Sequence, residues 1–215
     1  FRRKLVEKRT RAKNGVRELL RTHGIRAPRR PGLWSRKGQQ WLKQLELDDM
    51  QALRRDLLVE EIETLSNQLP RVEKQLKLYS QDNLAVWQLR SIPGIGLRTA
   101  EAVVAFIDDP RRFSRSKQVG AYFGLVPSQD QSGPINRLGH ITKEGSATVR
   151  HLLVESAWQA ASRSPTVAAY LDRIQRGDKE RRKTAVVATA HYLVRVMWSM
   201  LKEGTMWRER VAAAA

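Results

Sequence analysis

Several residue types and patterns are missing from this chain, and each absence narrows its class. The 215 residues include no cysteine, which excludes disulfides and thiolate metal sites, and the four histidines lack metal-ligand spacing. No apolar run approaches the roughly 18 residues of a membrane-spanning helix, and no charged-then-apolar leader opens the chain. We therefore expect no metal or other cofactor in this chain, no membrane partner and a cytoplasmic location.

Acidic residues are scarce relative to basic ones. Lys and Arg number 40 against 22 Asp and Glu, which gives a formal net charge of +18, typical of proteins that bind phosphate-rich partners. The charge is uneven, since residues 1–43 carry +13, residues 44–110 carry −5 and residues 111–215 carry +10. This division predicts two nucleic-acid-facing surfaces joined by a segment that contacts protein.

Helical periodicity dominates the first 83 residues. A basic helix is predicted over residues 1–23, with Gly24 as its left-handed terminator, and a short helix starts near Ser35. A long helix follows from Asp48, and Pro70 should kink or break it. Its apolar residues recur at coiled-coil spacings of 4 and 3, at Leu58, Ile62, Leu65, Leu69, Val72, Leu76 and Tyr79. The partner of this seam is the helix at 1–23, a second copy of the chain, or both.

The remaining residues, 84–215, predict a second helical domain. Two helices, at 84–90 and 99–107, flank the turn Ile92–Gly96 in a helix-hairpin-helix pattern. Further helices are predicted over 113–122, 146–162, 164–174 and 184–201, around a polar loop at 128–145 that shows no convincing strand. The expected fold is all-α, with a basic helix and coiled-coil helix in residues 1–83 and a helix-hairpin-helix domain in residues 84–215.

The turn at Pro93–Gly96 is a candidate phosphate clamp. Gly94 and Gly96 lack Cβ atoms, so the turn can expose backbone amides beside the positive end of the next helix. Arg98 and Thr99 add side-chain donors that would position a duplex without reading its bases. The alternative is an ordinary tight turn between two helices.

Ser132 is the candidate nucleophile. A serine before Gly133 and Pro134 is by default a turn residue, but Arg137, Lys143 and Arg150 follow within 18 residues. Phosphoryl transfer depends mainly on positioning and on neutralising the non-bridging oxygens, which these cations could supply. No Ser/His/Asp arrangement and no paired carboxylates accompany Ser132, so an activating cation would be held outside this chain.

Taken in order, these elements resemble the C-terminal transposase domain of the insertion-sequence one-ten family, which includes Piv-type DNA invertases and bridge-RNA-guided recombinases. The resemblance covers roughly residues 84–203, and the basic helix and coiled coil resemble the family's interdomain linker. It is carried by Ile92–Gly96, Thr99–Ala100, Asp109–Phe113, Tyr122–Pro127, Ser132–Gly133, Gly139, Ile141–Lys143, Gly145 and Arg150.

The resemblance implies a prokaryotic enzyme in which the residue matching Ser132 attacks a DNA phosphodiester and forms a covalent phosphoserine. It also implies a guide RNA, a homo-oligomer (dimer or tetramer) through the coiled coil, and a RuvC-like domain that binds Mg²⁺ through four acidic residues before the coiled coil. Because the chain begins at Phe1 without that domain, we expect a fragment with half of a composite active site, inert alone.

The leading hypothesis is therefore a DNA transposase or site-specific recombinase. A non-catalytic helix-hairpin-helix module that binds DNA or RNA is the alternative. A third hypothesis is a helical oligomerisation protein whose charge serves solubility.

Overall fold

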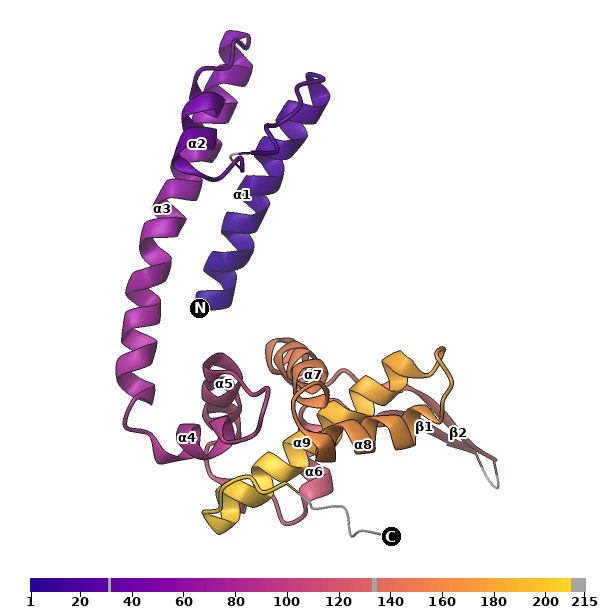
Figure 1. The fold of residues 1–215 in the computed structure, drawn as a ribbon. Coiled ribbons are helices and arrows are strands. Elements are labelled where there is room, and N and C mark those ends of the chain that lie inside the picture. The colour runs from indigo at the N-terminus through magenta and orange to yellow at the C-terminus, as the bar shows by residue number, and fades with distance from the viewer. Residues whose placement is uncertain (31, 133–134, 210–215) are drawn as a thin grey trace. The chain divides into compact units, whose positions relative to one another are not determined.

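A computed structural model describes residues 1–30, 32–132 and 135–209, without the side chains of residues 132, 135 and 136. Over these residues the chain forms nine α-helices, one 3-10 turn and two strands, which confirms the helical class (Figure 1). The chain divides into two compact units, residues 1–81 and 82–215, and the predicted boundary lay two residues later. In the described parts of the chain, no helix combines the length and apolarity needed to cross a bilayer.

The first unit is built on two antiparallel helices. Helix α1 (Arg2–Thr22) packs along α3 (Asp49–Ser80), so α1 is one partner of the predicted seam (Figure 1). Gly24, with φ +66°, follows the end of α1 as predicted. The Asp48 carboxylate caps α3 by accepting a hydrogen bond from the Gln51 amide at 3.0 Å.

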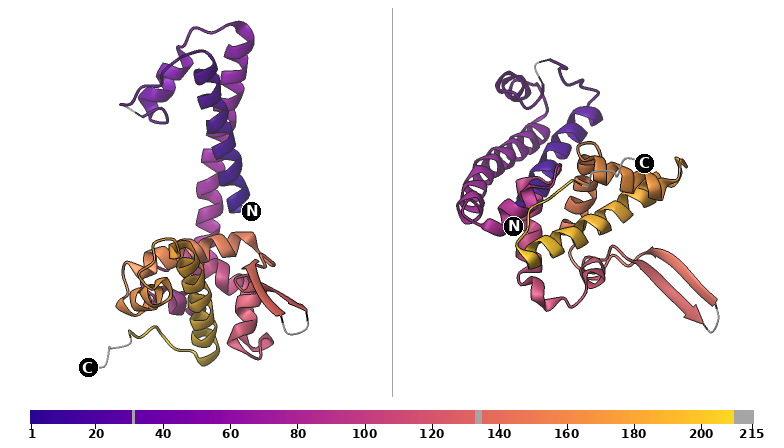
Figure 2. Two further views of the ribbon diagram at one scale, coloured as in Figure 1. Left: turned by 90° about the vertical axis from the view of Figure 1, so that its right-hand side faces the viewer. Right: turned by 60° about the horizontal axis from the view of Figure 1, so that its bottom comes forward.

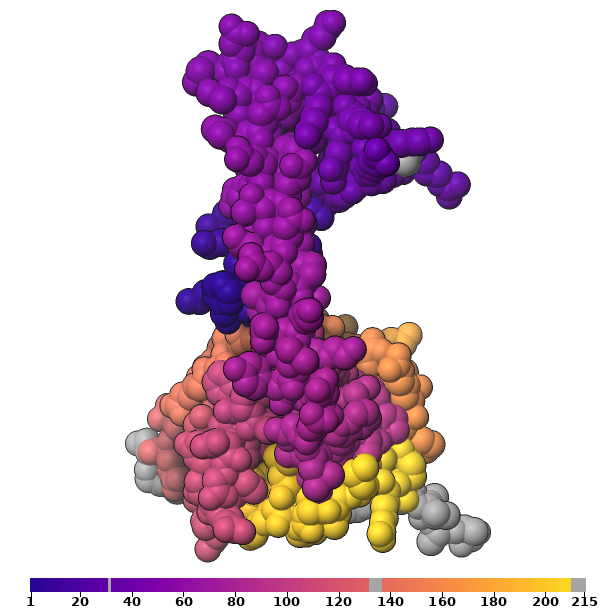
Figure 3. Space-filling model, turned by 90° about the vertical axis from the view of Figure 1, so that its left-hand side faces the viewer, coloured from indigo at the N-terminus to yellow at the C-terminus, as the bar shows by residue number. Residues whose placement is uncertain are grey.

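The seam of α3 is buried only in its middle. Ile62, Leu65 and Leu69 are buried against α1, whereas Tyr79 is 83% exposed. Arg2 Nε donates to Glu73 Oε1 at 2.7 Å near the end of the paired region. The helix continues through Pro70, so a break there is excluded, whereas the alternative of a kink stays a prediction; Pro70 is exposed. Figure 3 faces the long helix and shows its outer side.

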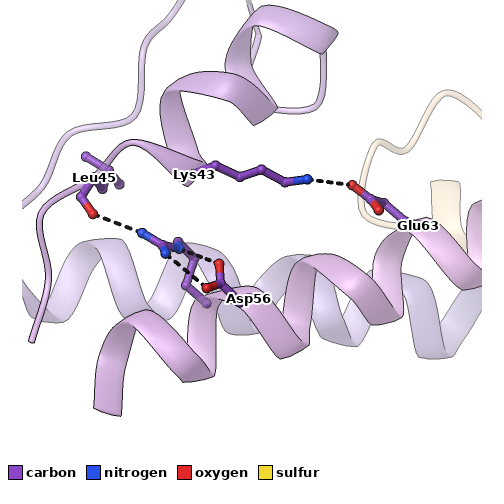
Figure 4. Close-up of polar contacts among 5 residues, drawn as sticks. Lys43, Leu45, Asp56 and Glu63 are labelled. Atoms are coloured by element: carbon purple, nitrogen blue, oxygen red, sulfur yellow. Dashed lines mark hydrogen bonds and ion pairs between the residues drawn. The ribbon is translucent and has the colours of Figure 1, made fainter. Parts of the chain in front are cut away.

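Short helix α2 (Arg36–Lys43) is tied to α3 by polar contacts (Figure 4). The buried Arg55 guanidinium donates from Nη1 to the Leu45 carbonyl at 2.9 Å and from Nε to Asp56 Oδ1 at 2.9 Å. Lys43 Nζ pairs with Glu63 at 3.4 Å. A buried guanidinium needs such partners, so this contact fixes the loop after α2 on α3.

The second unit is built around one central helix. Helix α9 (Arg182–Glu203) packs against four others: α4 (Leu84–Arg90), α6 (Ser116–Tyr122), α7 (Ala147–Ala161) and α8 (Pro165–Gln175). Helix α5 (Leu97–Ile107) packs against α4 and α7, and the 3-10 turn spans Pro110–Arg112. Ser146 and Ser164 cap α7 and α8 through the amides of Val149 and Val167, as their sequence positions indicate.

The predicted polar loop at 128–145 is wrong, because strands β1 (Pro127–Ser132) and β2 (Ile135–Ile141) pair there as an antiparallel ribbon. The ribbon projects from the helices of its own unit (Figure 2, right). Gln129, Asp130, Arg137 and Leu138 are all exposed. Because these described side chains from both faces are exposed, they do not show the apolar alternation that reveals a strand.

Candidate active site and nucleic-acid interface

The turn before α5 is packed tightly into its unit. Gly94 has φ +89°, and a Cβ there would overlap the backbone nitrogen of Ala160 near the end of α7. The Ile95 amide donates to the Ile92 carbonyl at 3.0 Å, and both side chains are buried. The glycine at position 94 is therefore required by the helix packing, independently of any ligand.

Three predicted clamp residues begin α5, and they differ in exposure. Gly96 is exposed at the N-cap, with φ −79° and open space where a Cβ would lie. Arg98 is half-buried and pairs with Glu101 at 2.7 Å. Thr99 is buried, and its hydroxyl hydrogen-bonds the Ser156 hydroxyl of α7 at 3.0 Å. A nucleic acid could reach the first helical amides, but the Thr99 hydroxyl faces the protein interior.

The base of the β1–β2 ribbon is anchored in the apolar core. The Thr142 amide donates to the Val126 carbonyl at 2.9 Å, next to the buried side chains of Phe123 and Leu125. Gly124 has φ +64°, and a Cβ there would overlap the backbone of Glu144. The two ends of the ribbon are thus held against each other and against the end of α6.

Arg150 strengthens this anchor. Its Nη1 donates to the Phe123 carbonyl at 3.1 Å and to the Glu144 carbonyl at 2.6 Å. The guanidinium is half-buried, and these two carbonyl partners leave its positive charge uncompensated. Arg150 therefore joins α7 to both ends of the ribbon.

The cations of the ribbon are open to solvent. Arg137 lies directly opposite Asp130 in the strand register and is exposed. Lys143, just after β2, is exposed and has φ +57°. Ser132 is the last residue of β1 and pairs with Ile135; its side chain, like residues 133 and 134, lies outside the described part of the chain.

The turn before α5 and the β1–β2 ribbon contact opposite ends of α7. Gly94 contacts α7 at Ala160, whereas Arg150 joins the ribbon to the first turn of the same helix. Ten helical residues correspond to about 15 Å. One phosphate therefore could not contact both places, whereas a DNA strand is long enough to do so.

The sequence interpretation missed a groove lined by α8, α9 and Ser116. Its volume is about 740 Å³, and its walls include stacked Tyr170 and Tyr192 together with Arg173 and Arg195. A signal was present in the sequence, because the pattern Tyr-Leu-x-Arg occurs twice, at 170–173 and at 192–195. Residues three apart share a helix face, which could have placed each arginine beside its tyrosine.

The described residues do not offer a metal centre. Among them, no group of three or more His, Asp or Glu could hold a metal ion. The Mg²⁺ implied by the family resemblance therefore does not fit this part of the chain.

Comparison with known proteins identifies the domain that contains these elements. Residues 87–172 match the Transposase IS116/IS110/IS902 family. This stretch belongs to that family. The match includes the turn before α5, the whole β1–β2 ribbon and α7, so the predicted family resemblance is confirmed.

Relatives extend the similarity beyond this domain. A "Probable family 20 transposase" of Pseudomonas aeruginosa is 32% identical over 95% of this chain and 62% of its own length. The transposase for insertion sequence element IS1328 of Yersinia enterocolitica is 32% identical over 66% of this chain and 43% of its own length. The pilin gene-inverting protein of Moraxella lacunata is 25% identical over 57% of this chain and 38% of its own length. The chain thus spans less than two thirds of each of these relatives.

Proposed function

We propose that this chain is the C-terminal portion of a DNA transposase or site-specific recombinase, in which Ser132 supplies the nucleophilic oxygen. The observation that carries the proposal is the place of Ser132 at the end of β1, on an exposed ribbon anchored in the core. Similarity to transposases and to a gene-inverting protein supports DNA as the substrate.

The reaction is a transesterification at one phosphorus atom of the DNA backbone. The Ser132 hydroxyl oxygen bonds to phosphorus and gives up its proton, the bond from phosphorus to a deoxyribose oxygen breaks, and the leaving oxygen takes up a proton, so the proton count is unchanged. The strand is then held as a phosphoserine ester, so reversal of the attack can reseal DNA without another energy source. The exposed charges of Arg137 and Lys143 stabilise the non-bridging oxygens, and Arg150 positions the base of the ribbon.

A second contact holds the duplex away from the reacting phosphate. The amides at the start of α5, around Gly96 and Arg98, bind a backbone phosphate at the positive end of that helix. This contact carries no sequence information, so it fits the non-specific part of DNA binding.

The first unit carries the surfaces that bind the partners of the complete enzyme. The basic side of α1, with Lys4, Lys8 and Arg11 exposed, binds a structured guide RNA. The exposed apolar end of α3, at Leu78 and Tyr79, contacts a second copy in a dimer or tetramer. Any Mg²⁺ is held by a RuvC-like domain outside this chain, so the chain alone does not recombine DNA.

Capture of the covalent intermediate tests the nucleophile. The complete protein is incubated with a radiolabelled nicked DNA substrate, and SDS-resistant protein–DNA adducts are measured by gel electrophoresis. We expect an adduct on the peptide that contains Ser132, and no adduct with Ser132→Ala. DNA affinity should change less than about twofold, because one neutral hydroxyl contributes little to phosphate binding.

Ser128→Ala is the matched control, since Ser128 is an exposed serine on the same strand. It should retain the adduct. Recombination by Ser132→Ala would reject the assignment. Salt-sensitive binding without any adduct would instead support the non-catalytic DNA- or RNA-binding module, and undetectable binding at low salt would support the oligomerisation protein.

A further inference from the structure

We propose that the groove between α8 and α9 binds single-stranded nucleic acid, with an unpaired base stacked beside Tyr170 and Tyr192 and its phosphates held by Arg173 and Arg195. The proposal rests on the proposed function only in taking a nucleic acid as the substrate. It adds a binding site outside the β1–β2 ribbon and outside the turn before α5.

Aromatic rings form one wall of this groove. The rings of Tyr170 and Tyr192 are stacked, with centroids 4.3 Å apart and planes 15° from parallel. The Arg173 guanidinium lies over the Tyr170 ring at 5.0 Å from its centroid. A stack of two aromatic rings and a guanidinium ends in planar faces. An unpaired base can stack on such a face whichever base it is.

The charged groups match a nucleic-acid backbone. No Asp or Glu is among the described residues that line the groove. Arg195 is half-buried and donates from Nε to Ser116 Oγ at 3.2 Å, an arrangement that orients the guanidinium without neutralising it. Lys202 adds a cation over the ring of Trp198, which also lines the groove. Phosphates would therefore meet positive charge along the groove.

Two carboxylates in this unit, Glu209 and Glu203, have other partners. Glu209 accepts hydrogen bonds from the Ser164 hydroxyl and the Thr166 amide at the start of α8. Glu203 accepts from the Ser199 hydroxyl at 2.9 Å on α9. In the described part of the chain, neither carboxylate forms an ion pair with Arg173 or Arg195.

Packing of the two helices holds Tyr170 and Tyr192 against each other. In each Tyr-Leu-x-Arg segment the leucine is buried, at 5% exposure for Leu171 and 0% for Leu193, and the tyrosine and arginine share the opposite side. The two leucines fix α8 and α9 in the core, so the tyrosines meet without help from a ligand. A preformed stacking surface loses little conformational freedom on binding.

Crosslinking locates the strand. The 215-residue chain is irradiated with a 12-nucleotide DNA strand that carries 5-iodouracil, and adducts are mapped by mass spectrometry. We expect them at Tyr170, Tyr192 or Trp198. Adducts confined to other residues would overturn the proposal.

Affinity measurements provide the second readout, by fluorescence anisotropy with the same strand and with a duplex of equal length. Tyr170→Leu should weaken single-strand binding at least about fivefold, which is the low end for loss of one stacked base, and duplex binding less than twofold. Arg173→Gln should also lower the salt dependence of single-strand binding. Circular dichroism melting checks that both variants fold.

Arg181→Gln is the matched control, since Arg181 is exposed in the loop before α9 and does not line the groove. If it weakens single-strand binding as much as Arg173→Gln does, the groove is not a specific site. Equal competition by polyglutamate would reduce the groove to an anion site and also overturn the proposal. If the duplex binds and the serine adduct forms without groove adducts, only this inference fails. If neither nucleic acid binds at low salt, the proposed function fails as well.

Discussion

The turn before α5 and the β1–β2 ribbon lie in the same unit, and both have glycines near basic residues. They differ in how far their side chains are buried. Gly94 fits against the backbone of α7, and Thr99 is buried. Arg137 and Lys143 are exposed. A glycine-rich, basic segment can therefore be required by packing or open to a ligand, and only the contacts around it distinguish the two cases.

The largest effect is expected for Gly94→Ala. A side chain at φ +89° costs about 1–2 kcal/mol, and overlap with the Ala160 backbone adds roughly 1–3 kcal/mol. We expect the free energy of unfolding, measured in urea, to fall by about 2–5 kcal/mol.

Gly96→Ala is its matched control. Gly96 has an ordinary φ of −79° and no atom within 4 Å of the added Cβ, so the change should stay below about 1 kcal/mol. Equal losses for the two alanines would show that the turn is not packed as described. The comparison between turn and ribbon would then fail.

Arg150 and Arg137 give the second test, because one anchors the ribbon and the other is exposed on it. Arg150→Gln removes the donor to Phe123 and Glu144 and should cost about 2 kcal/mol of unfolding free energy. Arg137→Gln should change stability by less than about 0.5 kcal/mol. It should instead weaken DNA binding and lower the salt slope by about 0.9. The opposite assignment of effects, stability to Arg137 and affinity to Arg150, would contradict the proposed division of roles.

Most helices were predictable because each buries an apolar stripe and is marked at its ends. Ser146, Ser164 and Asp48 cap the helices that their sequence positions predict. Gly24 ends α1 for the same local reason. The coiled-coil spacing correctly predicted that α3 faces another helix, and the choice of α1 required the structure.

Other features depend on contacts between distant segments. Described side chains on both strands, such as Gln129, Asp130 and Arg137, are polar and exposed, so backbone pairing forms strands that side-chain periodicity does not reveal. Thr99 meets Ser156 across 57 positions of sequence, so its burial could not be inferred from its own turn. Likewise, Tyr170 and Tyr192 meet only because their helices pack together.

The smallest effect is expected at Glu209, which is exposed like the ribbon but hydrogen-bonded like the turn. Slight burial would raise its pKa, but hydrogen bonds from Thr166, Trp207 and Ser164 outweigh it and hold the pKa at about 2. A lowered carboxyl pKa stabilises the fold above the unfolded-state value, and this contribution is lost as pH falls toward 2.

Glu209→Gln should therefore reduce stability at pH 7 by less than about 1 kcal/mol, since solvent screens an exposed carboxylate. The difference from the unsubstituted chain should shrink between about pH 5 and pH 2 in urea unfolding. Glu180→Gln removes an exposed carboxylate outside these hydrogen bonds and is the matched control. A difference that grows on acidification would mean that the Glu209 carboxylate destabilises the fold. An exposed side chain held by three donors would then contribute no more to the structure than the open cations of the ribbon.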